Sequence, residues 1–489
     1  MDYKDTLNYL YNSVPMFQQV GSKAYKEGLE NTIAFDEYLG HPHREFRSIH
    51  VAGTNGKGSC SHTLAAILQS AGYRVGLYTS PHLIDFRERI RVNGEPVSES
   101  YVVRFVEEHR PFFEPLSPSF FELTTAMAFR YFADEKIDIA IIEVGMGGRL
   151  DCTNIIRPEL CIITNISLDH TQFLGDTLEK IAAEKAGIIK EGVPVVIGAT
   201  TEETRPVFLR KAEEASAPIE FVEDEQKIKK TTLKSTILLD QVIAEEEKAI
   251  SECTRLIEKV KEVLDKESIR QAQQQAALCQ QILKQHERYY NAIGWVYEAD
   301  EYPNLESELG GFYQPENAEI ILHALSQLKT LNYRFEEKDV RYGFAHVCEL
   351  TGLMGRWQKV NESPLMICDT GHNVAGISSV ISLFSLLQYK KLHIVIGMVN
   401  DKDICGILEL LPKEATYYFT KASVKRALPE KELRNLARNY GLRGNCYPSV
   451  AAAVKAAKNK SLPQDFIFVG GSSFIVADLL ASRNTLNLH

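Results

Sequence analysis

The chain has 489 residues, enough for two or three domains that each bury a full core. Its composition, 44% hydrophobic and 25% charged, is typical of a folded globular protein, and no apolar run approaches the roughly 18 residues that span a membrane. The formal net charge of −10 disfavours nonspecific binding to nucleic acid, so an anionic substrate would need a local basic patch.

The nine cysteines are an odd number without a CxxC pair, which favours reduced thiols over disulfides or a zinc site. The opening "MDYKDTLNYL" is charged and shows no apolar export signal. We therefore expect a cytoplasmic protein.

Strand-like runs alternate with helical patterns from about residue 47. Residues 47–53 read as a strand, 58–72 as a helix and 74–80 as the next strand, with further strands at 137–145, 160–167 and 193–198. Near-continuous Val, Ile and Leu runs separated by helices predict a parallel sheet covered on both faces.

The turn after the first strand, "VAGTNGKGS" at 51–59, almost matches a phosphate-binding P-loop. The usual spacing requires Gly at 51 and Ser or Thr at 58, but the chain has Val51 and Gly58, with its hydroxyl at Ser59. A strand, a glycine-rich turn and a helix N-terminus are what a phosphate cradle needs. An ATP site is therefore the favoured interpretation over a tight turn that happens to hold Lys57.

Polar residues follow three of the predicted strands. Ser80, Glu143 and His170 each stand at or just beyond a strand's carboxyl end, where open parallel sheets bind ligands. Glu143 and Ser80 suit Mg²⁺, which prefers oxygen, whereas a histidine ligand is less usual. Each residue alone could equally be solvated or cap a helix.

The middle of the chain differs in composition. Residues 238–290 are rich in Glu, Lys and Gln and contain no Gly or Pro. Apolar residues recur at alternating spacings of three and four, which predicts two amphipathic helices broken near 265–268. We expect a helical hairpin insertion over about 227–300, either a structural decoration or a partner-binding arm.

A second α/β pattern follows, with strands expected at 365–371, 392–399, 415–420 and 465–472. The joint falls near 351–356, where two glycines interrupt the pattern. The sequence thus predicts an N-terminal domain over 1–352, which includes the insertion, and a C-terminal domain over 353–489.

Several motifs together resemble the folylpolyglutamate synthase/dihydrofolate synthase family of the Mur-ligase-like superfamily. In order, they are "HVAGTNGKGS", "YTSPHL", "FRERIRVNG", "IIEVGMGGRLDCTN", "NISLDHTQFLG", "IAAEKAGIIK" and "DTGHN". The resemblance covers about 30–225 and 303–478, and the shifted P-loop is similar to that family's own variant. It implies a P-loop parallel-sheet ATPase domain of the Mur central type, followed by a smaller Rossmann-like glutamate ligase domain.

The resemblance implies an ATP-dependent ligase that joins L-glutamate to dihydropteroate, to reduced folates or to both. Its partners would be these small molecules, with no nucleic acid and no membrane, and we expect a monomer. One alternative is a Mur-type ligase acting on a cell-wall precursor; another is a non-catalytic nucleotide-binding regulator that acts through the helical hairpin.

The resemblance also implies roles for individual residues. Nucleotide binding falls to Gly53, Thr54, Asn55, Gly56, Lys57, Gly58, Ser59, Asn317, Arg356 and Asp369. Magnesium falls to Ser80, Glu143 and His170, and catalysis to Lys57, Lys185 and His372. Lys185 matches a lysine that the family carries as a carbamate, a modification that requires a lowered amine pKa.

The same resemblance also implies a binding site for the pterin substrate. Its residues would be Ser119, Phe120, Phe121, Glu122, Leu150, Asp151 and Cys152. Phenylalanines at helical spacing are also typical of a hydrophobic core. Arg87, Arg89 and Arg91 either help to attract an anionic folate or form a solvated hairpin.

Overall fold

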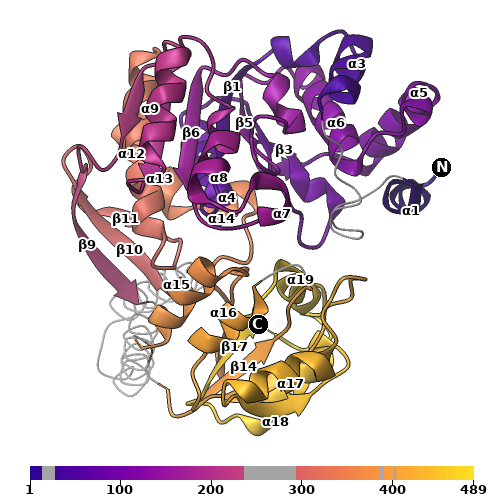
Figure 1. Cartoon of the computed structure of the whole chain (residues 1–489), viewed down its shortest axis with the longest axis vertical. Helices are drawn as coiled ribbons and strands as arrows, with labels where there is room; N and C mark the ends of the chain where they lie inside the picture. The colour runs from indigo at the N-terminus through magenta and orange to yellow at the C-terminus, as the bar shows by residue number, and fades with distance from the viewer. Residues whose placement is uncertain (14–27, 236–292, 386, 388, 401–402, 489) are drawn as a thin grey trace, which may run out of the picture.

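The computed structural model describes residues 1–13, 28–235, 293–385, 387, 389–400 and 403–488. Two large sheets, each sandwiched between helices, form the upper and lower bodies in Figure 1, the lower one coloured orange to yellow.

The first sheet has eight strands in the order β4-β3-β2-β5-β1-β6-β7-β8. Its strands are β1 (Arg47–Ala52), β2 (Val75–Tyr78), β3 (Ile90–Val92), β4 (Glu95–Pro96), β5 (Ile139–Glu143), β6 (Leu160–Asn165), β7 (Val195–Ala199) and β8 (Ile219–Phe221). The predicted parallel strands are all present. The sheet is nevertheless mixed, because β3 and β4 form an antiparallel hairpin at its edge.

Helices cover both faces of this sheet because its strands alternate their buried side chains. Ile139 and Ile141 of β5 face one core with α4 (Lys57–Ser70), α12 (Gln314–Thr330) and α13 (Glu337–Ala345). Ala140 and Ile142 face the opposite core. The helices on that side are α1 (Tyr3–Ser13), α3 (Glu30–Tyr38), α5 (Glu99–Leu116), α6 (Phe120–Asp134), α8 (Leu178–Ala186) and α9 (Arg205–Glu214).

A three-stranded antiparallel sheet stands beside α12 and α13 in Figure 1. It consists of β9 (Ile228–Ser235), β10 (Ile293–Ala299) and β11 (Leu305–Ser307). The expectation of a helical insertion over about 227–300 is therefore wrong at both ends, where Thr and aromatic residues pair as strands. The central stretch, where the two amphipathic helices were expected, lies outside the described residues.

The second sheet has the order β12-β13-β17-β14-β15-β16, and only β12 is antiparallel to its neighbour. Its strands are β12 (Gln358–Asn361), β13 (Leu365–Cys368), β14 (Leu392–Ile396), β15 (Thr416–Phe419), β16 (Arg443–Cys446) and β17 (Phe466–Gly470). One face carries α15 (Val374–Phe384), α16 (Ile404–Leu410) and α17 (Glu430–Asn439); the other carries α18 (Val450–Lys460) and α19 (Ser473–Ala481).

Short helices complete the described structure: η2 (Pro42–Arg44), η3 (Phe86–Arg89), η4 (Cys152–Ile155), α7 (Thr171–Leu174) and α14 (Val347–Thr351). Within the described ranges, none of the helices has both the length and the apolar character that crossing a membrane demands.

An ion-pair cluster joins α12 to β8. His323 is fully buried and pairs with Glu220 and Glu319, while its Nε2 lies 2.8 Å from the Glu225 carbonyl oxygen. Burial by itself lowers the pKa of His323, but its hydrogen bonds to the two carboxylates raise it from 6.5 to about 9. The cluster therefore stabilises the fold mainly when His323 is protonated.

This cluster predicts a pH-dependent stability. A raised folded-state pKa contributes stability that is complete below pH 6.5 and is lost as the pH rises through about 9. We expect His323→Gln to lower the free energy of unfolding more below pH 6.5 than above pH 9, measured by denaturant titration. His346→Gln, at a partly exposed histidine, is the control; an equal loss for His323→Gln at both pH values would contradict the assignment.

Candidate active site

The carboxyl ends of both large sheets open onto one cavity of about 640 Å³. From the first sheet it receives Gly53 after β1, Glu143 at the end of β5 and Asn165 at the end of β6. From the second it receives Asp369 after β13 and Ser472 after β17. The site is therefore built jointly by the two α/β bodies.

The turn from β1 to α4 is pressed against β6. Thr54 N donates to Asn165 O at 2.9 Å, and Asn55 N donates to Asn165 Oδ1 at 3.0 Å. Gly53 and Gly56 have φ of +143° and +88°, and a Cβ on them would lie 1.9 Å from Thr164 Oγ1 and 2.3 Å from Asn317 Oδ1, respectively. Only glycine fits at both positions.

Two lysines, the half-buried Lys57 and the buried Lys185, meet at the carbonyl oxygen of Gly53. Lys57 Nζ, at the start of α4, donates to it at 3.0 Å, and Lys185 Nζ, from α8, donates to it at 2.8 Å. Burial lowers the pKa of Lys57, while Glu143 and Asp169 oppose that change. Burial, and then the charge of Lys57, lowers the pKa of Lys185 to about 7. The two amines thus differ, because the amine of Lys185, with a pKa of about 7, is partly neutral at physiological pH.

Carboxylates face these amines. Glu143 is 5% exposed, and its Oε2 accepts a hydrogen bond from Ser80 N at 3.0 Å. Burial raises the pKa of Glu143, although Lys57 counteracts this. A buried carboxylate beside a serine is a set of oxygen donors that fits Mg²⁺. Asp169 lies close by, with its Oδ2 4.0 Å from His170 Nε2.

The second sheet adds a turn anchored on Asp369. This buried carboxylate accepts hydrogen bonds from Trp357 N and Gly371 N, both at 2.7 Å, and from the Tyr313 hydroxyl at 3.0 Å. Burial raises the pKa of Asp369, and the neighbouring Arg356 guanidinium counteracts this. The anchored turn therefore points Arg356 into the cavity.

Two contacts from the loop after β13 reach the first body. His372 Nε2 lies 3.8 Å from Asp169 Oδ2, and Asn373 Nδ2 donates to Asn55 Oδ1 at 3.1 Å. The latter contact ties the phosphate loop directly to the second body.

The predicted substrate residues also line the cavity. Ser119 and Glu122 form a capping box at the start of α6, with Ser119 N donating to Glu122 Oε2 at 2.5 Å. Phe120 packs on Phe86 with ring centroids 5.8 Å apart, and Phe121 stacks on Tyr78 at 5.9 Å. Phe120 belongs to the core, Phe121 is partly buried against it, and both also line the cavity.

The glycine turn after β5 supplies further lining residues, Leu150, Asp151 and Cys152. Asp151 is 5% exposed and accepts from Met146 N at 2.8 Å and from the Thr153 hydroxyl at 2.5 Å. Burial raises the pKa of Asp151 and raises that of the Cys152 thiol well above its usual value.

The arginines separate into two groups. Arg89 and Arg91 are 3% and 6% exposed and line the cavity, so the solvated-hairpin interpretation is wrong for them. Arg89 Nε donates to His82 Nδ1 at 2.7 Å, and its guanidinium lies 5.2 Å from the Phe120 ring centroid. Arg87 is paired with Asp85 and lies outside the cavity lining.

One predicted residue takes a supporting place. Asn317 is 3% exposed, lies behind Gly56 and donates to Gln314 Oε1 at 3.0 Å, and it does not line the cavity. All the other predicted site residues line it. Tyr313 and Asn165 were not predicted as site residues, although Asn165 is the first residue of the motif "NISLDHTQFLG".

Comparisons with known proteins agree with this architecture. Residues 51–242 match the Mur ligase middle domain, and residues 355–473 match the Mur ligase glutamate ligase domain. The fold and site therefore define a ligase built from the two Mur ligase domains, the middle domain and the glutamate ligase domain.

A relative from Escherichia coli strain K12, dihydrofolate synthase/folylpolyglutamate synthase, is 30% identical over 434 residues, covering 88% of this chain and 85% of its own. The structure of E. coli FolC in complex with DHPP and ADP superposes with a TM-score of 0.74, at 28% identity over 100% of this chain and 99% of that one. The structure of the bifunctional folylpolyglutamate synthase/dihydrofolate synthase of Yersinia pestis with AMPPNP and a Mn ion superposes with a TM-score of 0.73. The two sequences are 26% identical, and the superposition covers 99% of this chain and 98% of that one.

The chain belongs to the folylpolyglutamate synthase/dihydrofolate synthase family, and it is an ATP-dependent glutamate ligase. The predicted family, fold class and enzyme class are confirmed.

Two glycines of the phosphate loop offer a matched test. Gly56→Ala forces a side chain onto a φ of +88° and into Asn317, so we expect loss of ATP binding together with a lower melting temperature. A Cβ on Gly58 would meet Arg356 Nη2 at 3.6 Å and the Glu143 carboxylate at 3.8 Å, which are ordinary contacts.

Gly58→Ala is therefore expected to keep the melting temperature while weakening ATP binding about tenfold or more, because its methyl group narrows the space between Arg356 and Glu143. Calorimetric titration with ATP and thermal unfolding measure the two effects. Wild-type ATP affinity in Gly56→Ala would contradict the assignment of the loop.

Proposed function

We propose that this chain couples ATP cleavage to the joining of L-glutamate with dihydropteroate, a reduced folate or both. The proposal rests above all on the convergence of Lys57, Glu143 and Arg356 on one cavity between the two sheets. The E. coli relative whose structure contains DHPP and ADP supports the choice of substrates.

The reaction takes two steps. A carboxylate oxygen of the acid attacks the γ-phosphorus of ATP, the bond to the β-phosphate oxygen breaks, and ADP leaves. The glutamate amine then attacks the acyl carbon, phosphate leaves with its electron pair, and the amine proton is released as the amide forms. Catalysis of phosphoryl transfer depends mainly on positioning and charge stabilisation.

The residues of the first body would meet the phosphates. Gly53, Thr54, Asn55, Gly56, Gly58 and Ser59 form the cradle, and Lys57 would leave its loop carbonyls to bind the phosphate oxygens. Glu143 and Ser80, with His170 and Asp169 beside them, would hold Mg²⁺. Bound there, the ion would offset charge on the transferred group.

The second body would complete the nucleotide site. Arg356 and Asp369 would contact the nucleotide, and Asn317 would support the loop from behind. His372 faces the reacting end of the cavity, where it would orient the acyl phosphate or the incoming amine.

The part of the cavity lined by Phe120 and Phe121 suits an aromatic acid. Phe120 and Phe121 offer ring faces, and Ser119, Glu122, Leu150, Asp151 and Cys152 complete the walls. Buried Arg89 and Arg91 supply the local basic patch that an anionic substrate requires in a chain of net charge −10.

The proposal includes a division into domains 1–352 and 353–489, which agrees with the glutamate ligase match beginning at residue 355. It also includes a monomer that works in the cytoplasm.

The first test mixes purified protein with Mg·ATP, L-glutamate and either 7,8-dihydropteroate or a reduced monoglutamyl folate, and measures amide product and ADP. We expect product that depends on all three substrates. Lys57→Ala should lower the rate by about 100-fold or more, since it removes charge stabilisation of the transferred phosphoryl group.

Product from both acceptors assigns a bifunctional enzyme, and product from one assigns that activity alone. Folded protein that binds ATP but yields no amide from either acceptor would overturn the folate proposal. Such a result would favour a Mur-type substrate or a regulatory role.

Lys185 is proposed to carry a carbamate. Its neutral Nζ attacks CO₂, an N–C bond forms and a proton passes to water, leaving an anion beside Lys57. With a pKa of about 7, the amine is mostly protonated below pH 7 and mostly neutral above it. Uptake of CO₂ should therefore increase as the pH rises through this value.

Native mass spectrometry in bicarbonate should show one labile carbamate on the wild type and on the control Lys190→Ala. Lys190 also has a lowered pKa, but it donates to Asn154 O and does not line the cavity. Lys185→Ala should lose the adduct and most activity, with partial recovery in added acetate. Full activity in CO₂-free buffer would contradict the role.

A further inference from the structure

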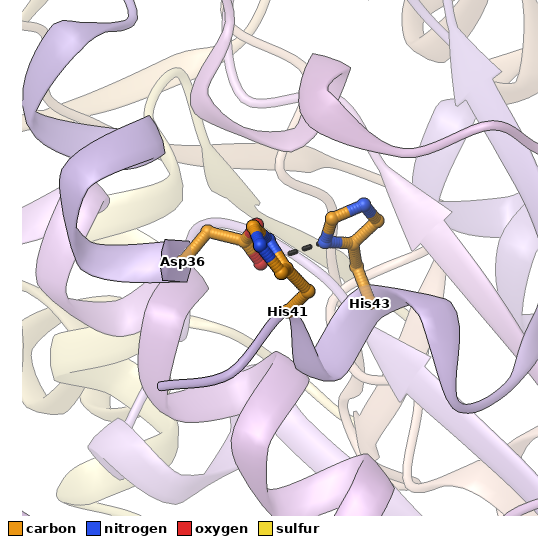
Figure 2. A group of neighbouring side chains, drawn as sticks. All are labelled: Asp36, His41 and His43. Atoms are coloured by element: carbon orange, nitrogen blue, oxygen red, sulfur yellow. Dashed lines mark hydrogen bonds and ion pairs between the residues drawn. The ribbon is translucent and has the colours of Figure 1, made fainter. Parts of the chain in front are cut away.

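Three side chains with metal-binding groups gather away from the active-site cavity. Asp36 lies near the end of α3, and His41 and His43 lie on either side of Pro42 in the turn that forms η2. None of the three lines the cavity. Figure 2 shows both imidazoles turned toward the Asp36 carboxylate.

The two histidines occupy different oxygens of the same carboxylate. His41 Nδ1 lies 2.7 Å from Asp36 Oδ2, and His43 Nδ1 lies 2.6 Å from Asp36 Oδ1. The candidate ligand atoms of the three side chains all lie within 4.8 Å of one another. The three candidate ligand atoms thus already lie close together.

The backbone holds this arrangement. His41 has a left-handed φ of 59°, and its N–H donates to the Asp36 carbonyl oxygen at 2.8 Å. Pro42 then fixes the start of η2. A histidine in the left-handed region is uncommon, so the turn is set by its surroundings.

The three side chains differ in their exposure to solvent. The side chains of Asp36 and His43 are 8% and 11% exposed, whereas that of His41 is 35% exposed. An ion therefore has a route past His41 to two sheltered ligands.

The donor set has a definite chemistry. Two imidazole nitrogens and one carboxylate oxygen are typical ligands of Zn²⁺ and similar transition-metal ions, whereas Mg²⁺ and Ca²⁺ strongly prefer oxygen ligands.

We propose that Asp36, His41 and His43 form a second metal site, separate from the nucleotide site, that takes one Zn²⁺ ion. A carboxylate oxygen and the two Nδ1 atoms bind the ion, and each histidine is then the neutral tautomer that carries its single ring proton on Nε2. Ligands about 2.0–2.1 Å from a tetrahedral ion lie about 3.3 Å apart, so the outermost pair closes by at most about 1.5 Å. Water takes the fourth position, on the exposed side of His41.

The ion would fasten α3 to η2. Both elements pack against α6, which begins with Phe120, and α3 also contacts η4, which begins with Cys152. A metal here would thus restrict the motion of α6 and η4, which carry predicted substrate residues, without contacting the substrate.

The test titrates chelator-treated full-length protein with Zn²⁺ in excess Mg²⁺, by competition with a chromogenic chelator, and follows thermal unfolding in parallel. The variants are His41→Gln and His43→Gln. His346→Gln is the matched control, because His346 Nδ1 has a single carboxylate partner, Glu349 Oε2 at 3.2 Å. Glu143→Gln reports on zinc taken up by the active site.

We expect one Zn²⁺ per chain in the wild type, His346→Gln and Glu143→Gln. Either cluster variant should bind at least about tenfold more weakly, and the zinc-induced rise in melting temperature should disappear. Because His41 is partly exposed, His41→Gln should fold normally without metal. Absence of tight Zn²⁺ binding to the wild type, equal binding by the cluster variants, or loss only in Glu143→Gln would overturn the proposal.

Discussion

The carbonyl oxygen of Gly53 is the point on which the active site depends. It accepts hydrogen bonds from both Lys57 and Lys185, which belong to helices on opposite faces of the first sheet. The oxygen can take this position only because Gly53 has no Cβ to collide with Thr164 of β6. A single backbone group thereby positions both amines at the cavity, Lys57 from one face of the sheet and Lys185 from the other.

Much of the fold could be predicted from the sequence, because buried parallel strands consist of short runs rich in Val and Ile. Residues 139–142 are an example, and their alternate side chains enter two different cores. The antiparallel additions were harder to predict. The hairpin of β3 and β4 is only a few residues long and includes Arg91, Glu95 and Pro96, and β9 pairs with a strand far along the chain. Pairing across such a distance leaves no periodic signal nearby.

The candidate site could be predicted as a set of residues but not as a geometry. Motifs placed Glu143 and Asp369 at strand ends, yet only the structure shows both lining one cavity from different sheets. The burial of Arg89 and Arg91 depends on packing against Phe120 and against the loop at Gly352, which no local pattern encodes. Asn317 has the right neighbours in sequence but reaches the loop from behind, since α12 lies on that side.

The hydrogen bond between Asn55 and Asn373 has a consequence for how the two bodies cooperate. Amide side chains carry no charge and do not titrate, so this link keeps its strength when the ionic strength or the acidity of the medium changes. The surrounding amines and carboxylates do respond to such changes. A change in pH or ionic strength therefore alters the charged groups of the active site but not the hydrogen bond between Asn55 and Asn373.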